Sequence, residues 1–85
     1  MTESSKILIV DDNQRICESI GALLEKQGHH IQTAISGKAA LQMLAHNNFD
    51  LALVDMYLPD MQGLDIMDSI RKNSPDTQMM VITGM

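Results

Sequence analysis

A run of apolar residues that ends in a carboxylate constrains the fold of this chain more than any other feature. Residues 51–54 are Leu-Ala-Leu-Val, Asp55 follows directly, and Pro59 and Gly63 come soon after. An apolar run without polar alternation indicates a short strand buried on both faces, as in a parallel sheet covered by helices. Pro59 and Gly63 predict an irregular loop after it. Asp55 is therefore expected at the C-terminal edge of the sheet, where open α/β folds bind their ligands.

Three further strand patterns accompany this one. Residues 6–10 form an apolar run that stops at Asp11 and Asp12, and residues 78–83 form another that stops at the hydroxyl of Thr83. Residues 29–34 are more polar, so we expect a strand nearer the edge of the sheet.

Helical spacing occupies the segments between the strands. The first helix follows Asp12 or Asn13, either of which can cap it, and stops at Gly28. The second opens at Ser36 and ends near residues 46–48, and the third ends before Pro75. The predicted buried faces hold Ile16, Ile20, Leu23 and Leu24 in the first helix, and Leu64, Met67 and Ile70, broadened by Ile66, in the third.

Alternation of strands and helices predicts an α/β fold with a parallel sheet, right-handed crossovers and helices on both faces. We interpret residues 1–85 as a single domain with a flavodoxin-like, doubly wound sheet. Its carboxylates meet only if the strand order is 2-1-3-4. The pattern stops at the fourth strand, which is apolar and has no successor. Either a second copy of the chain completes this strand, or a C-terminal portion is missing.

Composition excludes several classes of function. The net charge is -5 and the six Lys and Arg are scattered, so we expect no direct nucleic-acid binding. The single cysteine, Cys17, fits a reducing compartment and a structural role. No apolar run is long enough to span a membrane and no signal peptide is visible, so we expect a cytoplasmic protein. His29, His30 and His46 lack the neighbours of a zinc site and are interpreted as surface residues.

The strand ends bring together residues capable of phosphoryl chemistry. Asp11, Asp12, Asp55 and Thr83 all fall at one edge of the predicted sheet. Clustered carboxylates attract a hard cation, and Mg²⁺ is the best match, with the backbone carbonyl of Tyr57 as a further ligand. A carboxylate beside Mg²⁺ can act as a nucleophile toward a phosphoryl group and form an acyl phosphate. Taken alone, Asp11 and Asp12 could equally be helix caps.

These motifs resemble the receiver domain of two-component response regulators over nearly all of the chain. The matching segments are Ile-Leu-Ile-Val-Asp-Asp at 7–12, Leu-Val-Asp-Met-Tyr-Leu-Pro-Asp-Met-Gln-Gly at 53–63 and Val-Ile-Thr-Gly at 81–84. The resemblance implies a CheY-like fold in which Asp55 is the phosphoacceptor and Asp12 a Mg²⁺ ligand. It also implies that Asp11 supports the metal directly or through water, and that Thr83 is a switch hydroxyl. A sensor histidine kinase or a phosphotransfer protein would be the partner.

The sequence departs from the receiver pattern at its C-terminal end. Receiver domains carry a lysine after a fifth strand, followed by further helices, and this sequence stops earlier. Lys38 and Lys72 lie on predicted helices and do not replace that lysine.

We interpret the chain as a phosphoacceptor domain and not as an enzyme. Two alternative functions are considered. A pseudo-receiver would keep the fold as an interaction module, but such domains typically lose acidic residues that are present here. A phosphatase with an aspartyl nucleophile would need a second acid two residues later, where this chain has Tyr57.

Overall fold

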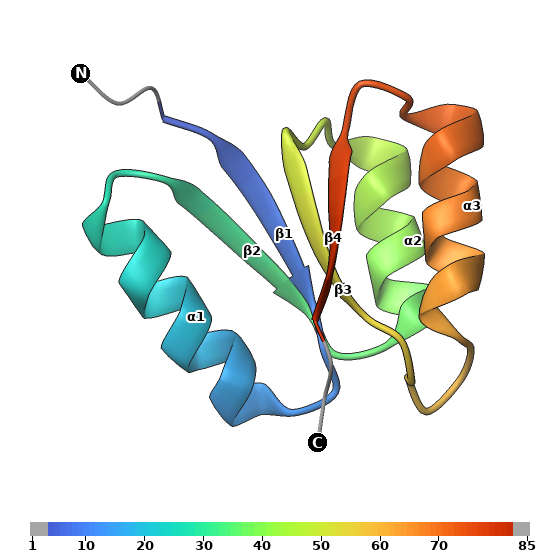
Figure 1. The fold of residues 1–85 in the computed structure, drawn as a ribbon, viewed down its shortest axis with the longest axis horizontal. Helices are drawn as coiled ribbons and strands as arrows, with labels where there is room; N and C mark the ends of the chain where they lie inside the picture. The colour runs from blue at the N-terminus through green and yellow to red at the C-terminus, as the bar shows by residue number, and fades with distance from the viewer. Residues whose placement is uncertain (1–3, 83–85) are drawn as a thin grey trace.

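The computed structural model describes residues 4–82. Four strands and three helices alternate along this part of the chain (Figure 1). In chain order they are β1 (Lys6–Val10), α1 (Gln14–Lys26), β2 (His30–Ala34), α2 (Gly37–His46), β3 (Leu51–Asp55), α3 (Gly63–Asn73) and β4 (Gln78–Ile82). The alternation predicted from the sequence is confirmed.

The four strands form one parallel sheet in the order β2-β1-β3-β4. The predicted order 2-1-3-4 is therefore correct, and β1 and β3 are neighbours. Val10 lies opposite Val54 in the register of these two strands. Because parallel strands end at the same edge, the residues that follow this pair, Asp11 and Asp55, lie side by side at that edge.

Helices cover both faces of the sheet. Figure 1 shows α1 on one side and α2 with α3 on the other. Alternate residues of a strand point to opposite faces, so Ile7 and Ile9 of β1 pack toward α1 while Leu8 and Val10 pack toward α2 and α3. The sheet thus separates two apolar clusters. This explains why β1 and β3 are apolar throughout instead of alternating.

The residues of α1 that are buried are small, and they differ from the large apolar residues predicted from the sequence. Cys17 is 2% exposed and Gly21 is buried, whereas Leu23 is 60% exposed. Gly21 faces β2, since a Cβ atom on it would meet Ile31 Cγ2 at 3.4 Å, an ordinary contact distance. The prediction that Leu23 belongs to the buried face is therefore wrong.

The buried face of α3 is also rotated from the predicted one. Ile66 and Ile70 are almost fully buried, while Leu64 is 48% exposed. The sequence pattern predicts Leu64 on the main buried side and Ile66 only as an extension of it. The reverse holds because Ile66 and Ile70, four residues apart, point into the cluster under the sheet.

Residues at the helix ends match the predicted stop and start signals. Asn13 caps α1, since its Oδ1 accepts hydrogen bonds from the N–H groups of Arg15 (3.0 Å) and Ile16 (3.3 Å). Of the two residues expected to cap this helix, it is Asn13 and not Asp12 that does so. Gly28 follows the helix with a φ of 93°, a left-handed conformation that glycine adopts without strain. Asp12 is thereby left free for another role.

The outer edge of β4 has no pairing strand among residues 4–82. Met80 is 57% exposed and Val81 is 40% exposed along this strand. In the same part of the chain, no helix combines the length and apolarity needed to cross a membrane.

Candidate functional site

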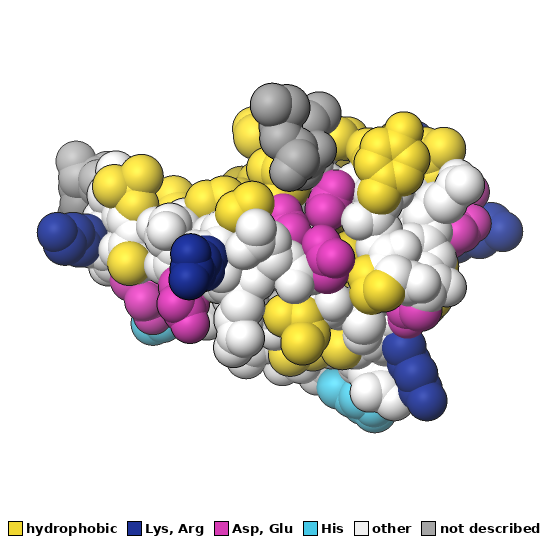
Figure 2. Space-filling view, turned by 90° about the horizontal axis from the view of Figure 1, so that it is seen from below, with side chains coloured by type: hydrophobic (Ala, Val, Ile, Leu, Met, Phe, Trp, Pro, Cys, Tyr) yellow, Lys and Arg dark blue, Asp and Glu magenta, His cyan; other side chains and the backbone are white. Residues whose placement is uncertain are grey.

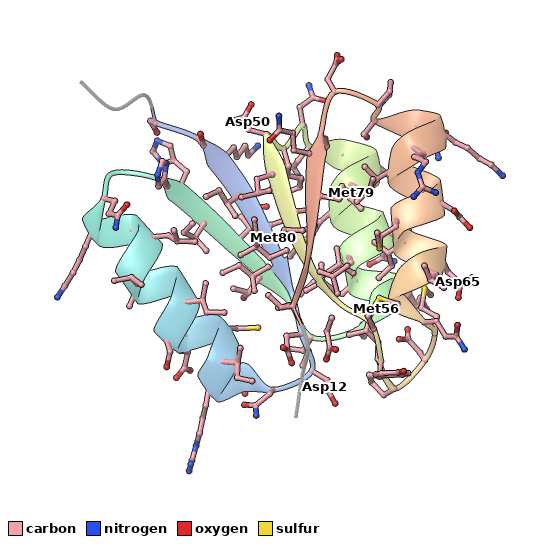
Figure 3. The ribbon with its side chains drawn as sticks, viewed as in Figure 1. Asp12, Asp50, Met56, Asp65, Met79 and Met80 are labelled. Atoms are coloured by element: carbon pink, nitrogen blue, oxygen red, sulfur yellow. The ribbon has the colours of Figure 1, made fainter. Side chains whose placement is uncertain are left out.

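Three carboxylates converge where β1 and β3 end. One carboxylate oxygen from each of Asp11, Asp12 and Asp55 lies within 4.8 Å of the other two. Figure 2 looks onto this edge of the sheet and shows acidic side chains gathered near its middle. Figure 3 shows Asp12 at this end of the sheet and Asp50 at the opposite end. The sequence prediction that these three residues come together is borne out by the geometry.

Asp11 is buried, with only 2% of its surface exposed. Its Oδ1 accepts a hydrogen bond from Asn13 N–H at 2.8 Å, and its backbone oxygen accepts one from the Cys17 thiol at 3.3 Å. The other carboxylate oxygen, Oδ2, is buried and has no hydrogen-bond partner within residues 4–82. A buried polar atom without a partner is costly, so this oxygen is available to a ligand.

Asp55 is also buried, at 3% exposure, and ends β3. Its Oδ1 accepts a hydrogen bond from Tyr57 N–H at 3.2 Å. That bond orients the carboxylate and fixes the backbone next to it. Tyr57 itself is 77% exposed, and the part of it that contacts the cluster is its backbone N–H, while its carbonyl stays a predicted ligand.

The loop after Asp55 closes tightly against the strand. Gly63 N–H donates to the backbone oxygen of Met56 at 2.8 Å. A Cβ atom at Gly63 would lie 2.3 Å from the backbone oxygen of Asp55, which is closer than real Cβ atoms come. Only glycine allows α3 to begin this near to the end of β3. The sequence pattern predicts only a loop at Gly63, whereas in the folded chain this glycine also permits close packing.

Electrostatics in the cluster favour a bound cation. Burial raises the pKa of Asp11, and the neighbouring carboxylates of Asp55 and Asp12 raise it further against the opposing hydrogen bond from Asn13. The one ion pair found in residues 4–82 joins Arg71 to Asp68 on the exposed side of α3, so it does not neutralise the cluster. Oxygen donors, clustered negative charge and a free buried oxygen together fit Mg²⁺.

The other predicted site residues fall in different places. Thr83 lies outside the described residues, so its position relative to the carboxylates stays a prediction. Lys38 is in the first turn of α2 and Lys72 is near the end of α3, so both lie on helices as predicted. Asp60 was not assigned a role from the sequence, yet its carboxylate bonds to the start of α2.

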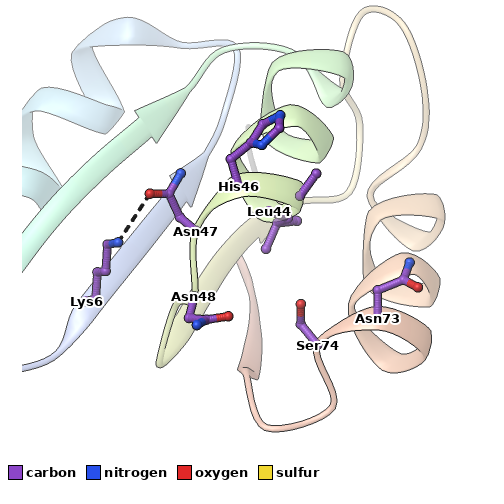
Figure 4. Close-up of a pocket in the computed structure, with 8 residues that line it drawn as sticks. Lys6, Leu44, His46, Asn47, Asn48, Asn73 and Ser74 are labelled. Carbon is purple, nitrogen blue, oxygen red and sulfur yellow. Dashed lines mark hydrogen bonds between the residues drawn. The ribbon is translucent and has the colours of Figure 1, made fainter.

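A separate pocket lies at the other edge of the sheet. It has a volume of about 610 Å³ and is lined mostly by polar residues from the start of β1 and the ends of α2 and α3 (Figure 4). Lys6 Nζ donates to Asn47 Oδ1 at 3.3 Å and lies 5.3 Å from the centre of the Phe49 ring. Those contacts already occupy the one lysine of the pocket. We therefore consider the carboxylate cluster, and not this pocket, as the candidate functional site.

Replacing Asp11 with Asn will make the metal-free protein more stable and weaken its binding of Mg²⁺. The amide keeps the oxygen that accepts from Asn13 but removes one charge from a buried, repulsive cluster. We expect the free energy of unfolding to rise by about 1 kcal/mol without metal. Urea unfolding with and without Mg²⁺ measures both effects. A loss of stability without metal would show that the charge of Asp11 is compensated by a partner in the protein.

Comparison with known proteins points to one family. The family model of the response regulator receiver domain matches residues 7–85. The response regulator ArlR of Staphylococcus saprophyticus is 37% identical over 80 residues, a match that covers 94% of this chain and 36% of that protein. The chain thus spans about a third of the length of this relative.

Solved structures agree with the sequence comparison. A CheY-like receiver domain protein from Methanospirillum hungatei has a TM-score of 0.93 and 32% identity, over 98% of this chain and 66% of that one. The response regulator TrrA from Thermotoga maritima, solved in complex with Mg²⁺ and BeF, has a TM-score of 0.87 and 34% identity. That match covers 94% of this chain and 70% of TrrA.

Proposed function

The chain belongs to the response regulator receiver domain family, and from that premise we propose that Asp55 is its phosphoacceptor. The donor is a sensor histidine kinase or a phosphotransfer protein. An oxygen of the Asp55 carboxylate bonds to phosphorus while the bond between phosphorus and the donor histidine nitrogen breaks. The product is an acyl phosphate, which signals to a downstream output. We treat residues 1–85 as part of a single receiver domain, which is modified rather than being an enzyme that acts on other substrates.

The convergence of Asp11, Asp12 and Asp55 is the observation that carries this proposal. Asp12 is exposed and Asp11 offers its free Oδ2, so these two carboxylates and Asp55 would hold Mg²⁺ with the carbonyl of Tyr57. When bound, the metal supplies positive charge against the phosphoryl oxygens. The Tyr57 N–H holds the Asp55 carboxylate in one orientation, which reduces the entropy lost on reaction. Thr83 remains the proposed switch hydroxyl.

A pseudo-receiver that only binds partners is the alternative, and the site geometry favours it less. An interaction module has no need for three mutually repelling carboxylates, two of them buried. Keeping such a cluster costs stability unless a cation offsets the repulsion.

Phosphorylation by a small-molecule donor tests the proposed function. The chain is incubated with acetyl phosphate and Mg²⁺, or with acetyl phosphate and a chelator, and its intact mass is measured. We expect one phosphoryl group to be added only when Mg²⁺ is present. Equal labelling with and without Mg²⁺ would contradict the assigned role of the carboxylate cluster.

We further propose that this chain self-associates along β4. The strand Gln78–Ile82 carries no charge and no proline to protect the edge that residues 4–82 leave unpaired, and a second copy can pair with it. Sedimentation velocity should show an average mass that rises with concentration. Met80→Lys should restore the monomer, whereas Leu23→Lys, at an exposed apolar position on α1, should not. A monomer at every concentration would refute this proposal.

A further inference from the structure

The carboxylate of Asp60 joins the loop after Asp55 to the start of another helix. Its Oδ1 accepts a hydrogen bond from Gly37 N–H at 2.8 Å, and its Oδ2 accepts one from Lys38 N–H at 2.9 Å. These are the first two N–H groups of α2, which no bond within the helix can satisfy. The two bonds lower the pKa of Asp60, as expected for a carboxylate at a helix N-terminus.

Close packing reinforces this junction. A Cβ atom on Gly37 would overlap the Met61 side chain, at 2.2 Å from its Cγ. Gly37 is buried in the contact, so the loop lies directly against the first turn of α2. The neighbours Asp60 and Met61 thus meet the same turn by hydrogen bonding and by packing.

Hydrogen bonds within the loop after Asp55 hold it in one shape, so a restraint at one point of the loop also restrains the rest. Leu58 N–H donates to the backbone oxygen of Met61 at 3.2 Å, and Tyr57 forms a bridge with Gln62. At the base of the loop, Gly63 N–H bonds to the Met56 oxygen. A segment closed in this way moves as a unit, so anchoring its tip at Asp60 also restrains Tyr57. Tyr57 in turn donates to the Asp55 carboxylate.

We propose that Asp60 is a positioning residue for the cation site. By fixing the loop to the first turn of α2, it sets where the Tyr57 N–H and carbonyl lie relative to Asp55. The inference rests on the proposed function, since it assigns Asp60 to the same Mg²⁺ site. Asp60 acts through Tyr57 and does not itself contact the metal.

A purely structural role for Asp60 makes a different prediction, and Ser36 provides the matched control. Ser36 caps the same helix, since its Oγ accepts from Ala39 N–H at 3.1 Å, but it has no bond to the loop. Ser36→Ala and Asp60→Ala both remove capping interactions from α2. Only Asp60→Ala releases the loop that carries Tyr57.

The experiment is a Mg²⁺ titration followed by the amide NMR signals of residues 11–13 and 55–57. We expect Asp60→Ala to weaken Mg²⁺ affinity about tenfold, in line with losses of outer-shell partners at other metal sites. Ser36→Ala should change it less than about twofold. Asp60→Asn, which keeps one acceptor oxygen, should fall between wild type and Asp60→Ala. It also serves as the test variant if Asp60→Ala does not fold.

The outcomes separate the two proposals. If the wild type binds Mg²⁺ at the carboxylates and both Asp60 variants bind it equally well, the positioning role is wrong and the proposed function stands. If Asp60→Ala and Ser36→Ala weakened Mg²⁺ binding equally, the positioning role would also be wrong. A general destabilisation of the start of α2 would then explain the loss of affinity. If the wild type shows no Mg²⁺ binding at the cluster, both proposals fail.

Discussion

Substitution of Asp55 by Asn will abolish formation of the acyl phosphate. The amide has nearly the same shape and keeps the oxygen that accepts from Tyr57 N–H, so the fold is preserved. It lacks the charged oxygen needed to attack phosphorus. We expect no phosphoryl adduct in the intact mass after incubation with acetyl phosphate and Mg²⁺ under conditions that label the wild type.

Asp68→Asn is the matched control for this loss. Asp68 is exposed on α3 and pairs with Arg71, away from the cluster. Its substitution removes the same charge from the chain and should leave labelling unchanged. An adduct retained in Asp55→Asn would move the phosphoacceptor to another residue and contradict the assignment.

Gly63→Ala will strongly destabilise the protein. The added Cβ atom would lie 2.3 Å from the Asp55 oxygen and 2.9 Å from Met56 Cα, and both are backbone atoms that cannot rotate away. We expect a loss of about 3 kcal/mol, at the upper end of overpacking effects and a large part of a small domain's stability. Urea unfolding measures it directly.

Gly21→Ala supplies the comparison. Its Cβ atom would meet Ile31 Cγ2 at 3.4 Å, an ordinary contact, and Gly21 lies inside α1, where alanine has the better helix propensity. This variant should match the wild type or exceed its stability by up to about 1 kcal/mol. If both variants behaved alike, close approach at Gly63 would not explain the need for glycine there.

Local patterns predicted the positions of the strands, and the flavodoxin-like fold supplied the sheet order in which their carboxylates meet. Apolar runs that end in acids marked β1 and β3, and parallel pairing places such ends at one edge. The buried faces of α1 and α3 were less well predicted. Periodicity gives weight to large apolar residues such as Leu23, whereas the residues of α1 that are buried, Cys17 and Gly21, are small.

The role of Asp60 could not be predicted from the sequence. Its partners, Gly37 and Lys38, lie more than twenty residues away, and no spacing rule links a loop carboxylate to a distant helix start. Ser36 alone satisfied the sequence signal for a cap on α2. The contact between Gly37 and Met61 is equally non-local, so only the folded chain reveals that the loop and helix form one unit.

Mapping a paramagnetic divalent cation tests the central claim most directly. Mn²⁺ added in small amounts broadens the NMR signals of amides close to where it binds. We predict that residues 11–13 and 55–57 lose their signals first, and that Asp11→Asn suppresses this loss. Broadening that begins instead around Asp50 or Asp68, with the signals of Asp12 and Asp55 intact, would contradict a cation site at the phosphoacceptor.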